Sequence, residues 1–129
     1  MSKQKALAKE LYELWLNGGR NHVFKAIKRR QNKRIITLVA EIVRNLQVDK
    51  YQLESFICDI KFCLEPTEAT GFIEVAQRDW REGYYDALFK NFSAKAKENI
   101  ILGTATLLKY MESNEIDSFI EKAKEHERE

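Results

Sequence analysis

The chain has 129 residues, of which 44% are hydrophobic and 33% charged, with a formal net charge of +2 at pH 7. This is the length of one domain with enough apolar residues for a packed core, which excludes intrinsic disorder of the whole chain. One proline and five glycines leave too few turn signals for an all-β sandwich or barrel. We therefore expect an all-α protein: a single helical domain over residues 1–129, a compact bundle of five to seven helices.

Apolar residues at helical spacing predict the elements of the N-terminal part in chain order. Residues 4–16 form the first helix, which ends at Asn17-Gly18-Gly19 because these residues favour the left-handed conformation. A short basic segment over residues 21–31 follows, with Asn21 as its N-cap. Residues 34–46 have a broad apolar face and predict a buried helix, although their β-branched start is also compatible with a strand.

The clearest helical period follows Asp49, which is a candidate N-cap, and continues to Leu64. Pro66 ends that helix because it cannot donate to the preceding turn. Residues 69–92 keep one apolar stripe in register, either as one long helix or as two joined near Gly71 or Gly83.

Two further helices complete the predicted bundle. One spans residues 94–111 with Ser93 as N-cap, and Gly103 in it permits a close helix crossing. The last begins at Ser113 or Asn114, and we expect the final six residues to fray.

The cysteines and the apolar runs bear on location. Cys58 and Cys63 are too few for a disulfide framework, and we expect both thiols to line the core. The first ten residues contain no apolar run of signal-peptide length, and no run approaches 18 apolar residues. We therefore expect a cytoplasmic protein that does not enter a membrane.

Charge is divided unevenly along the chain. The basic N-terminal half, residues 1–50, has twelve Lys or Arg and four Asp or Glu, which gives +8. The acidic C-terminal half, residues 51–129, has ten Lys or Arg and sixteen Asp or Glu, which gives −6. Such asymmetry is typical of a basic face that meets an anionic partner.

The basic charge is densest in residues 20–34, RNHVFKAIKRRQNKR, which contain seven cations and no acid. The seven are Arg20, Lys25, Lys28, Arg29, Arg30, Lys33 and Arg34. Crowded like charges repel one another, and a bound polyanion offsets that repulsion as it releases its condensed counterions. We predict that these residues bind the phosphates of DNA or RNA. No helix-turn-helix, zinc-finger or RNA-recognition motif surrounds them, so we expect an accessory factor rather than a sequence-reading regulator.

An alternative from another functional class is a protein-interaction or assembly module. In it the basic half meets the acidic half, in the same chain or in a second copy, or docks as an inhibitor or adaptor on a foreign protein. The simplest form of this alternative is a solvated cationic helix neutralised within its own chain.

Other residue clusters predict no chemistry. The aromatic run over residues 77–92 resembles a stacking platform for bases, but core packing is the favoured interpretation. Asp79, Glu82 and Asp86 predict a solvated acidic face rather than a metal site. His22 has no evident nucleophile beside it, and His126 lies in the tail that we expect to fray. We therefore predict a non-enzymatic protein with no catalytic residue, metal site or cofactor.

Overall fold

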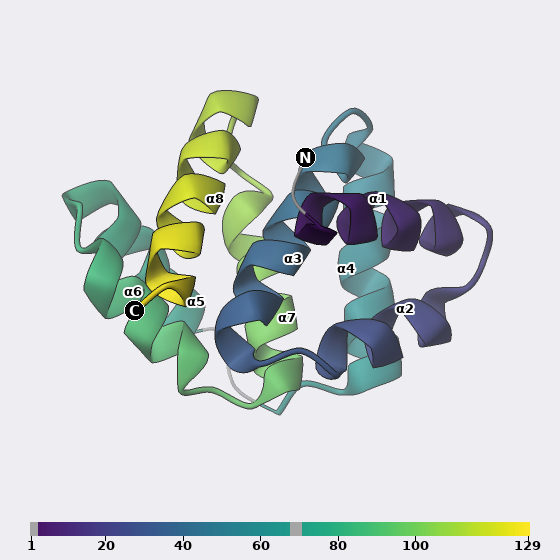
Figure 1. Cartoon of the computed structure of the whole chain (residues 1–129), viewed down its shortest axis with the longest axis horizontal. Coiled ribbons are helices and arrows are strands. Elements are labelled where there is room, and N and C mark those ends of the chain that lie inside the picture. The colour runs from purple at the N-terminus through teal and green to yellow at the C-terminus, as the bar shows by residue number, and fades with distance from the viewer. Residues whose placement is uncertain (1–2, 68–70) are drawn as a thin grey trace.

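Helix α3 (Asn32–Leu46) runs through the middle of the molecule, and the other helices surround it (Figure 1). The computed structural model describes residues 3–67 and 71–129, and all regular secondary structure in those residues is helical. The other helices are α1 (Lys3–Leu16), α2 (Arg20–Lys28), α4 (Lys50–Leu64), α5 (Gly71–Glu82), α6 (Tyr85–Ser93), α7 (Lys97–Leu108) and α8 (Ser113–Glu127).

Helix α3 is central because its sequence is apolar on nearly every side. Every residue from Ile35 to Val43 is buried, and α3 packs against α1, α2, α4, α6, α7 and α8. A helix that is apolar all round is stable only when neighbours cover its whole circumference. The helical prediction for this segment is confirmed, and the strand alternative is wrong.

The all-α class is confirmed, but the described residues form eight helices, not five to seven. The apolar stripe predicted over residues 69–92 is divided between α5 and α6. The break is at Gly83, which has φ +82°, a conformation that only glycine adopts without strain. Residues 68–70, which include the start of that stripe, lie outside the described residues.

Helix ends that depend on local residues are as predicted. Helix α1 ends before Gly18, which has φ +89°. The Asp49 carboxylate accepts a hydrogen bond of 2.9 Å from the Tyr51 amide at the start of α4. That helix ends at Leu64, two residues before Pro66.

Three predicted N-caps are wrong because their side chains bind elsewhere or lie inside a helix. Asn21 lies within α2, whose N-cap is Gly19. Ser93 is the last residue of α6, and Ala96 is the N-cap of α7. Ser113 is the first residue of α8, and its hydroxyl donates to Gln47 Oε1 at 2.9 Å.

Aromatic side chains from the C-terminal half join the core, as the favoured interpretation of residues 77–92 predicts. The Phe119 ring lies 5.4 Å from that of Trp80 and 5.2 Å from that of Phe89, centroid to centroid. Tyr84 is an exception, because it precedes α6 and is 58% exposed.

The close crossing predicted at Gly103 is confirmed. A Cβ atom at Gly103 would lie 2.7 Å from the Phe72 ring of α5 and 3.3 Å from the Phe92 ring of α6. The distance to Phe72 is too short for a real Cβ atom and the distance to Phe92 is tight, so the Phe72 ring uses the space that glycine leaves.

Two further findings concern the membrane and the thiols. Among the described residues, none of the helices has both the length and the apolar character needed to span a bilayer. Cys58 is exposed and Cys63 is half-buried, so the expectation that both line the core is wrong for Cys58. Cys58 lies on the outer side of α4, whose buried residues are Leu53, Phe56, Ile57 and Ile60.

Candidate nucleic-acid interface

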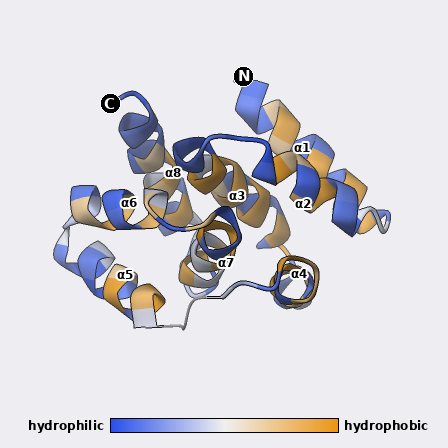
Figure 2. Ribbon diagram, turned by 90° about the horizontal axis from the view of Figure 1, so that it is seen from below, coloured by the Kyte–Doolittle hydropathy of each residue, from blue (hydrophilic) through white to orange (hydrophobic). Residues whose placement is uncertain are grey.

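The predicted basic segment becomes α2, a turn over residues 29–31 and the first turn of α3. Helix α2 buries Val23, Phe24 and Ile27, and the Phe24 ring lies 5.5 Å from that of Phe56 in α4. Because these apolar residues face the body of the protein, Lys25 on the opposite side of α2 is exposed. The turn between α2 and α3 is hydrophilic along its length (Figure 2).

Three of the seven predicted cations are bound to other parts of the chain, and we call them the paired cations. Arg20 Nη1 lies 3.3 Å from Asp59 Oδ1 in α4, and Lys28 Nζ lies 2.7 Å from Glu98 Oε1 in α7. Lys33 Nζ donates to the main-chain oxygen of Glu129 at 3.0 Å. The acidic half of the chain therefore neutralises part of the basic segment.

These pairs have measurable electrostatic consequences. The hydrogen bond from Lys28 is the main reason why the pKa of Glu98 is lowered from its ordinary 4.5. The Asp59 carboxylate also accepts a hydrogen bond of 2.9 Å from Trp15 Nε1, so one acid joins α1, α2 and α4. Arg20 has a second role, because its guanidinium lies 5.2 Å from the centre of the exposed Phe62 ring.

The other four predicted cations, Lys25, Arg29, Arg30 and Arg34, are exposed, and we call them the open cations. Within the described residues, none of these four side chains has a carboxylate within ion-pair distance or a hydrogen-bond acceptor. Arg29 and Arg30 follow α2 directly, and Arg34 is the third residue of α3. The tertiary structure thus leaves four positive charges grouped at one helix junction.

The backbone of this junction is anchored from three directions. Gln4 Nε2 in α1 donates to the Arg34 carbonyl at 3.0 Å, and Asn32 Nδ2 donates to the Ser93 carbonyl at 2.8 Å. Lys97 Nζ, at the start of α7, donates to the Arg30 carbonyl. The open cations therefore extend from a fixed main chain, which lowers the entropy cost of binding a ligand.

Two of the open cations also line a pocket. Arg30 and Arg34 line a hollow of about 430 Å³ beside Lys3 of α1, with Leu7 and Leu38 as apolar wall and Glu127 as the acidic member. Three basic side chains against one acid give this hollow a positive character. It extends the basic surface from the junction onto the start of α1.

Sequence reasoning missed the environment of His126. The imidazole is 6% exposed, its Nε2 lies 2.9 Å from Ser93 Oγ, and its Nδ1 lies 3.7 Å from Glu129 Oε2. Helix α8 continues to Glu127, so the expectation that the last six residues fray is wrong for residues 124–127. The only signal in the sequence for this environment was the aromatic character of residues 85–92, because the His126 ring stacks on the Phe89 ring with the two centroids 5.5 Å apart.

The amides that follow Ser93 are not free to form an oxyanion hole for this Ser–His–Glu arrangement. Ser93 ends α6, where the helix presents carbonyl oxygens and the negative end of its dipole. The two amides that follow, of Ala94 and Lys95, donate to the carbonyls of Lys90 and Phe92. A serine nucleophile needs the opposite, free amide donors for the oxyanion.

Burial and the nearby Lys33 charge lower the pKa of His126 below its ordinary 6.5. The bond between Ser93 and His126 thus satisfies one nitrogen of an imidazole that is kept neutral in the core. This hydrogen bond contributes to the stability of the fold.

The predicted acidic face is only partly observed. Glu82 and Asp86 are exposed, but Asp79 is 5% exposed and lies 3.5 Å from Arg78 Nη2, so the prediction is wrong for Asp79. Among residues 3–67 and 71–129, no group of three or more His, Cys, Asp or Glu side chains is arranged to hold a metal ion.

Comparisons with protein-family models, with curated proteins and with solved structures give no significant match to this chain. Its function therefore has to be inferred from its own residues and their geometry.

Proposed function

We propose that this protein is a non-enzymatic nucleic-acid-binding protein or accessory subunit whose open cations bind phosphates of DNA or RNA. The observation that supports the proposal is the grouping of Lys25, Arg29, Arg30 and Arg34 without acidic partners in the described chain. The proposed interface is smaller than the seven residues of the sequence prediction. Arg20, Lys28 and Lys33 are left out because each already has a partner within the chain.

The physical basis of the proposal is the cost of keeping four positive charges together. Solvent and salt reduce their mutual repulsion, and a bound multivalent anion offsets it further. A phosphate backbone supplies such an anion, and the counterions it releases make binding favourable at low salt. The lysine and arginine side chains reach phosphates without a base-reading helix, so we expect little sequence preference.

The test is a filter-binding titration against duplex DNA, single-stranded DNA and structured RNA over a range of salt concentrations. Four phosphate contacts predict a slope of log affinity against log salt of about −3 to −4 on duplex DNA. A matched control is Lys90→Glu, which reverses an exposed charge on α6 and should leave binding unchanged. No retention of any of the three polymers at low salt would overturn the proposal.

A protein-interaction or assembly role is the second candidate, and exposed apolar residues support it. Val48, Tyr51 and Tyr110 are 89%, 82% and 72% exposed. Tyr110 also lines a hollow of about 580 Å³ with Lys50 and Leu53 of α4. Exposed aromatic residues beside a hollow are typical of protein interfaces.

Sedimentation without nucleic acid, at low and at high salt, distinguishes the two candidates. A monomer at both salt concentrations, together with retention of nucleic acid, supports the phosphate-binding proposal. Salt-dependent association of the protein alone, with no retention of nucleic acid, supports the assembly role.

A further inference from the structure

Helix α4 has a second row of residues at helix-packing spacing, on the side that faces away from the core. Helix α4 packs against α2, α3 and α7, and its buried residues are Leu53, Phe56, Ile57 and Ile60. The exposed residues on the opposite side, which we call the outer stripe, are Tyr51, Ser55, Cys58 and Phe62. Their spacing of four, three and four residues is that of a seam between two packed helices. Helix α4 lies at the edge of the molecule (Figure 2), and no helix of the described chain covers this seam.

The outer stripe has the composition of a contact surface. None of its four residues is charged, although 33% of the chain is. Tyr51 and Phe62 are 82% and 72% exposed. Aromatic residues are enriched and charged residues depleted at the centre of protein interfaces. Between the two rings, Ser55 and Cys58 are small, so a second helix can approach closely there.

The order of residues along the outer stripe fits a second copy of the same helix in the antiparallel direction. A two-fold axis midway between Ser55 and Cys58 places each of them opposite the other residue in the second copy. The same axis places Tyr51 opposite Phe62 of the second copy, because the two are equally far from it. Rings then meet rings at both ends, and small residues meet small residues in the middle.

The charges beside the outer stripe agree with this arrangement. Glu54 and Lys61 lie on one flank of the stripe, and the two-fold axis brings Glu54 beside Lys61 of the second copy, twice by symmetry. The Glu54 side chain is 57% exposed and 3.7 Å from Lys109 Nζ, so it is open to a second cation. Lys61 is exposed and has no acidic partner among the residues that the structure describes. In a parallel pair, Glu54 would meet Asp59 of the second copy instead, which is repulsive.

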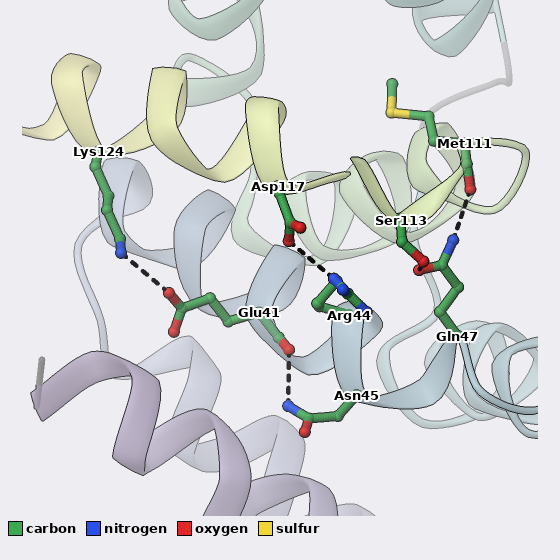
Figure 3. A network of polar contacts seen from close by, with 8 residues as sticks. All are labelled: Glu41, Arg44, Asn45, Gln47, Met111, Ser113, Asp117 and Lys124. Atoms are coloured by element: carbon green, nitrogen blue, oxygen red, sulfur yellow. Dashed lines mark hydrogen bonds and ion pairs between the residues drawn. The ribbon is translucent and has the colours of Figure 1, made fainter. Parts of the chain in front are cut away.

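Contacts within the chain hold both ends of this face in place. Gln47 Nε2 donates to the Met111 carbonyl at 2.8 Å, and Gln47 Oε1 accepts from Ser113 (Figure 3). These bonds fix the turn before α4 against the turn after α7. At the other end, the Arg20 guanidinium lies 5.2 Å from the centre of the Phe62 ring. A face that is already ordered loses little entropy when a partner binds.

We propose that the outer stripe binds the outer stripe of a second copy of this chain, antiparallel about a two-fold axis. A single pair of helices buries less than the roughly 1,200 Å² at which stable interfaces begin, so the dimer is weak. The proposal names the partner for the assembly role and does not rest on nucleic-acid binding, because none of the open cations is on α4. A dimer that also retains nucleic acid is therefore consistent with both roles, and a monomer that retains it overturns the dimer alone.

The test is sedimentation equilibrium of the full chain without nucleic acid, at protein concentrations from about 10 to about 500 µM. The mean mass should rise from that of one chain towards that of two and no further, because a two-fold interface closes. Phe62→Glu should weaken dimerisation by at least about tenfold, because it places a carboxylate against Tyr51 of the second copy. The matched control is Tyr84→Glu, a 58% exposed aromatic residue between α5 and α6, which should have no effect. If Phe62→Glu does not fold, the more exposed Tyr51→Glu replaces it.

A charge swap then tests the antiparallel register. Lys61→Glu and Glu54→Lys should each weaken the dimer by at least about threefold, because like charges meet at both flanking contacts. The double variant should recover to within about twofold of the wild type, since each contact again joins opposite charges. The proposal is overturned by a chain that stays monomeric, by an unchanged dimer in the outer-stripe variant, or by a double variant as weak as the single ones.

Discussion

The paired and the open cations come from one run of fifteen residues, yet the tertiary structure gives them different environments. Arg20 and Lys28 lie opposite acids of α4 and α7, and Lys33 reaches the main chain at Glu129. The open cations lie at and beside the helix junction, and none of them forms an ion pair with an acid of the described chain, although Glu127 borders the hollow that Arg30 and Arg34 line. The net charge of a segment is therefore a poor measure of how strongly it can bind an anionic ligand, because other parts of the fold neutralise some of its charges.

Among the predicted effects, the largest is the loss of nucleic-acid affinity when the charges of two open cations are reversed. Arg29→Glu with Arg30→Glu should lower affinity for duplex DNA by at least about tenfold at 100 mM salt and reduce the salt slope by about two, because two phosphate contacts are lost. Filter binding measures the affinity. Thermal unfolding should stay nearly unchanged because both side chains are exposed and lack a partner in the described chain. Loss of the fold together with loss of binding would contradict this division of roles.

Reversal of a paired cation should produce the converse result. Lys28→Glu places a second negative charge beside Glu98 and should lower the free energy of unfolding by about 0.2–1 kcal/mol, the range for exposed ion pairs. Urea unfolding at neutral pH measures this change. Lys25→Glu, the matched reversal of an open cation on the same helix, should leave stability unchanged. Equal destabilisation by the two variants would show that the ion pair is not the cause.

The acid dependence of stability sharpens the same comparison. The pKa of Glu98 is lower in the folded protein than its ordinary 4.5, chiefly through Lys28. The stability that this shift contributes is therefore present above pH 4.5 and is lost as pH falls through the folded pKa. Lys28→Met should raise the pKa of Glu98 towards 4.5, as an NMR titration of its carboxyl group would show. Arg29→Met should leave that pKa unchanged, and a shift in that variant would contradict the assignment to Lys28.

The smallest predicted effect is a change in the pKa of His126 when the charge of Lys33 is removed. Burial is the main reason why the pKa of His126 lies below 6.5, and the Lys33 charge lowers it further. A lowered pKa means that the unfolded chain binds this proton more tightly, so stability falls as pH drops from 6.5 towards the folded pKa. Lys33→Gln should raise the pKa of His126 slightly but leave it below 6.5. NMR titration of the imidazole measures this shift, and an unchanged or lower pKa would exclude the charge of Lys33 as a cause.

Local features of the chain were readable without the structure. The end of α1 before Gly18, the Asp49 cap and the stop before Pro66 each depend on the conformational preference of one or two residues. The break at Gly83 is of the same kind, and it is one of the alternatives that the sequence left open, because the apolar stripe continues through it. The prediction that Ser93 is an N-cap failed for a different reason. The Ser93 hydroxyl contacts the imidazole of His126, which is 33 residues away in sequence.

The sequence by itself determined the helical class, the buried character of residues 35–43 and the position of the basic run, since each follows from composition or from periodicity along the chain. Only the tertiary structure decided which of the seven cations have acidic partners, and which face of α4 its neighbours leave exposed. The physical reason is that pairing between charges depends on distances of a few ångströms between distant segments. Helical periodicity fixes which way a residue faces on its own helix, but not which helix it faces.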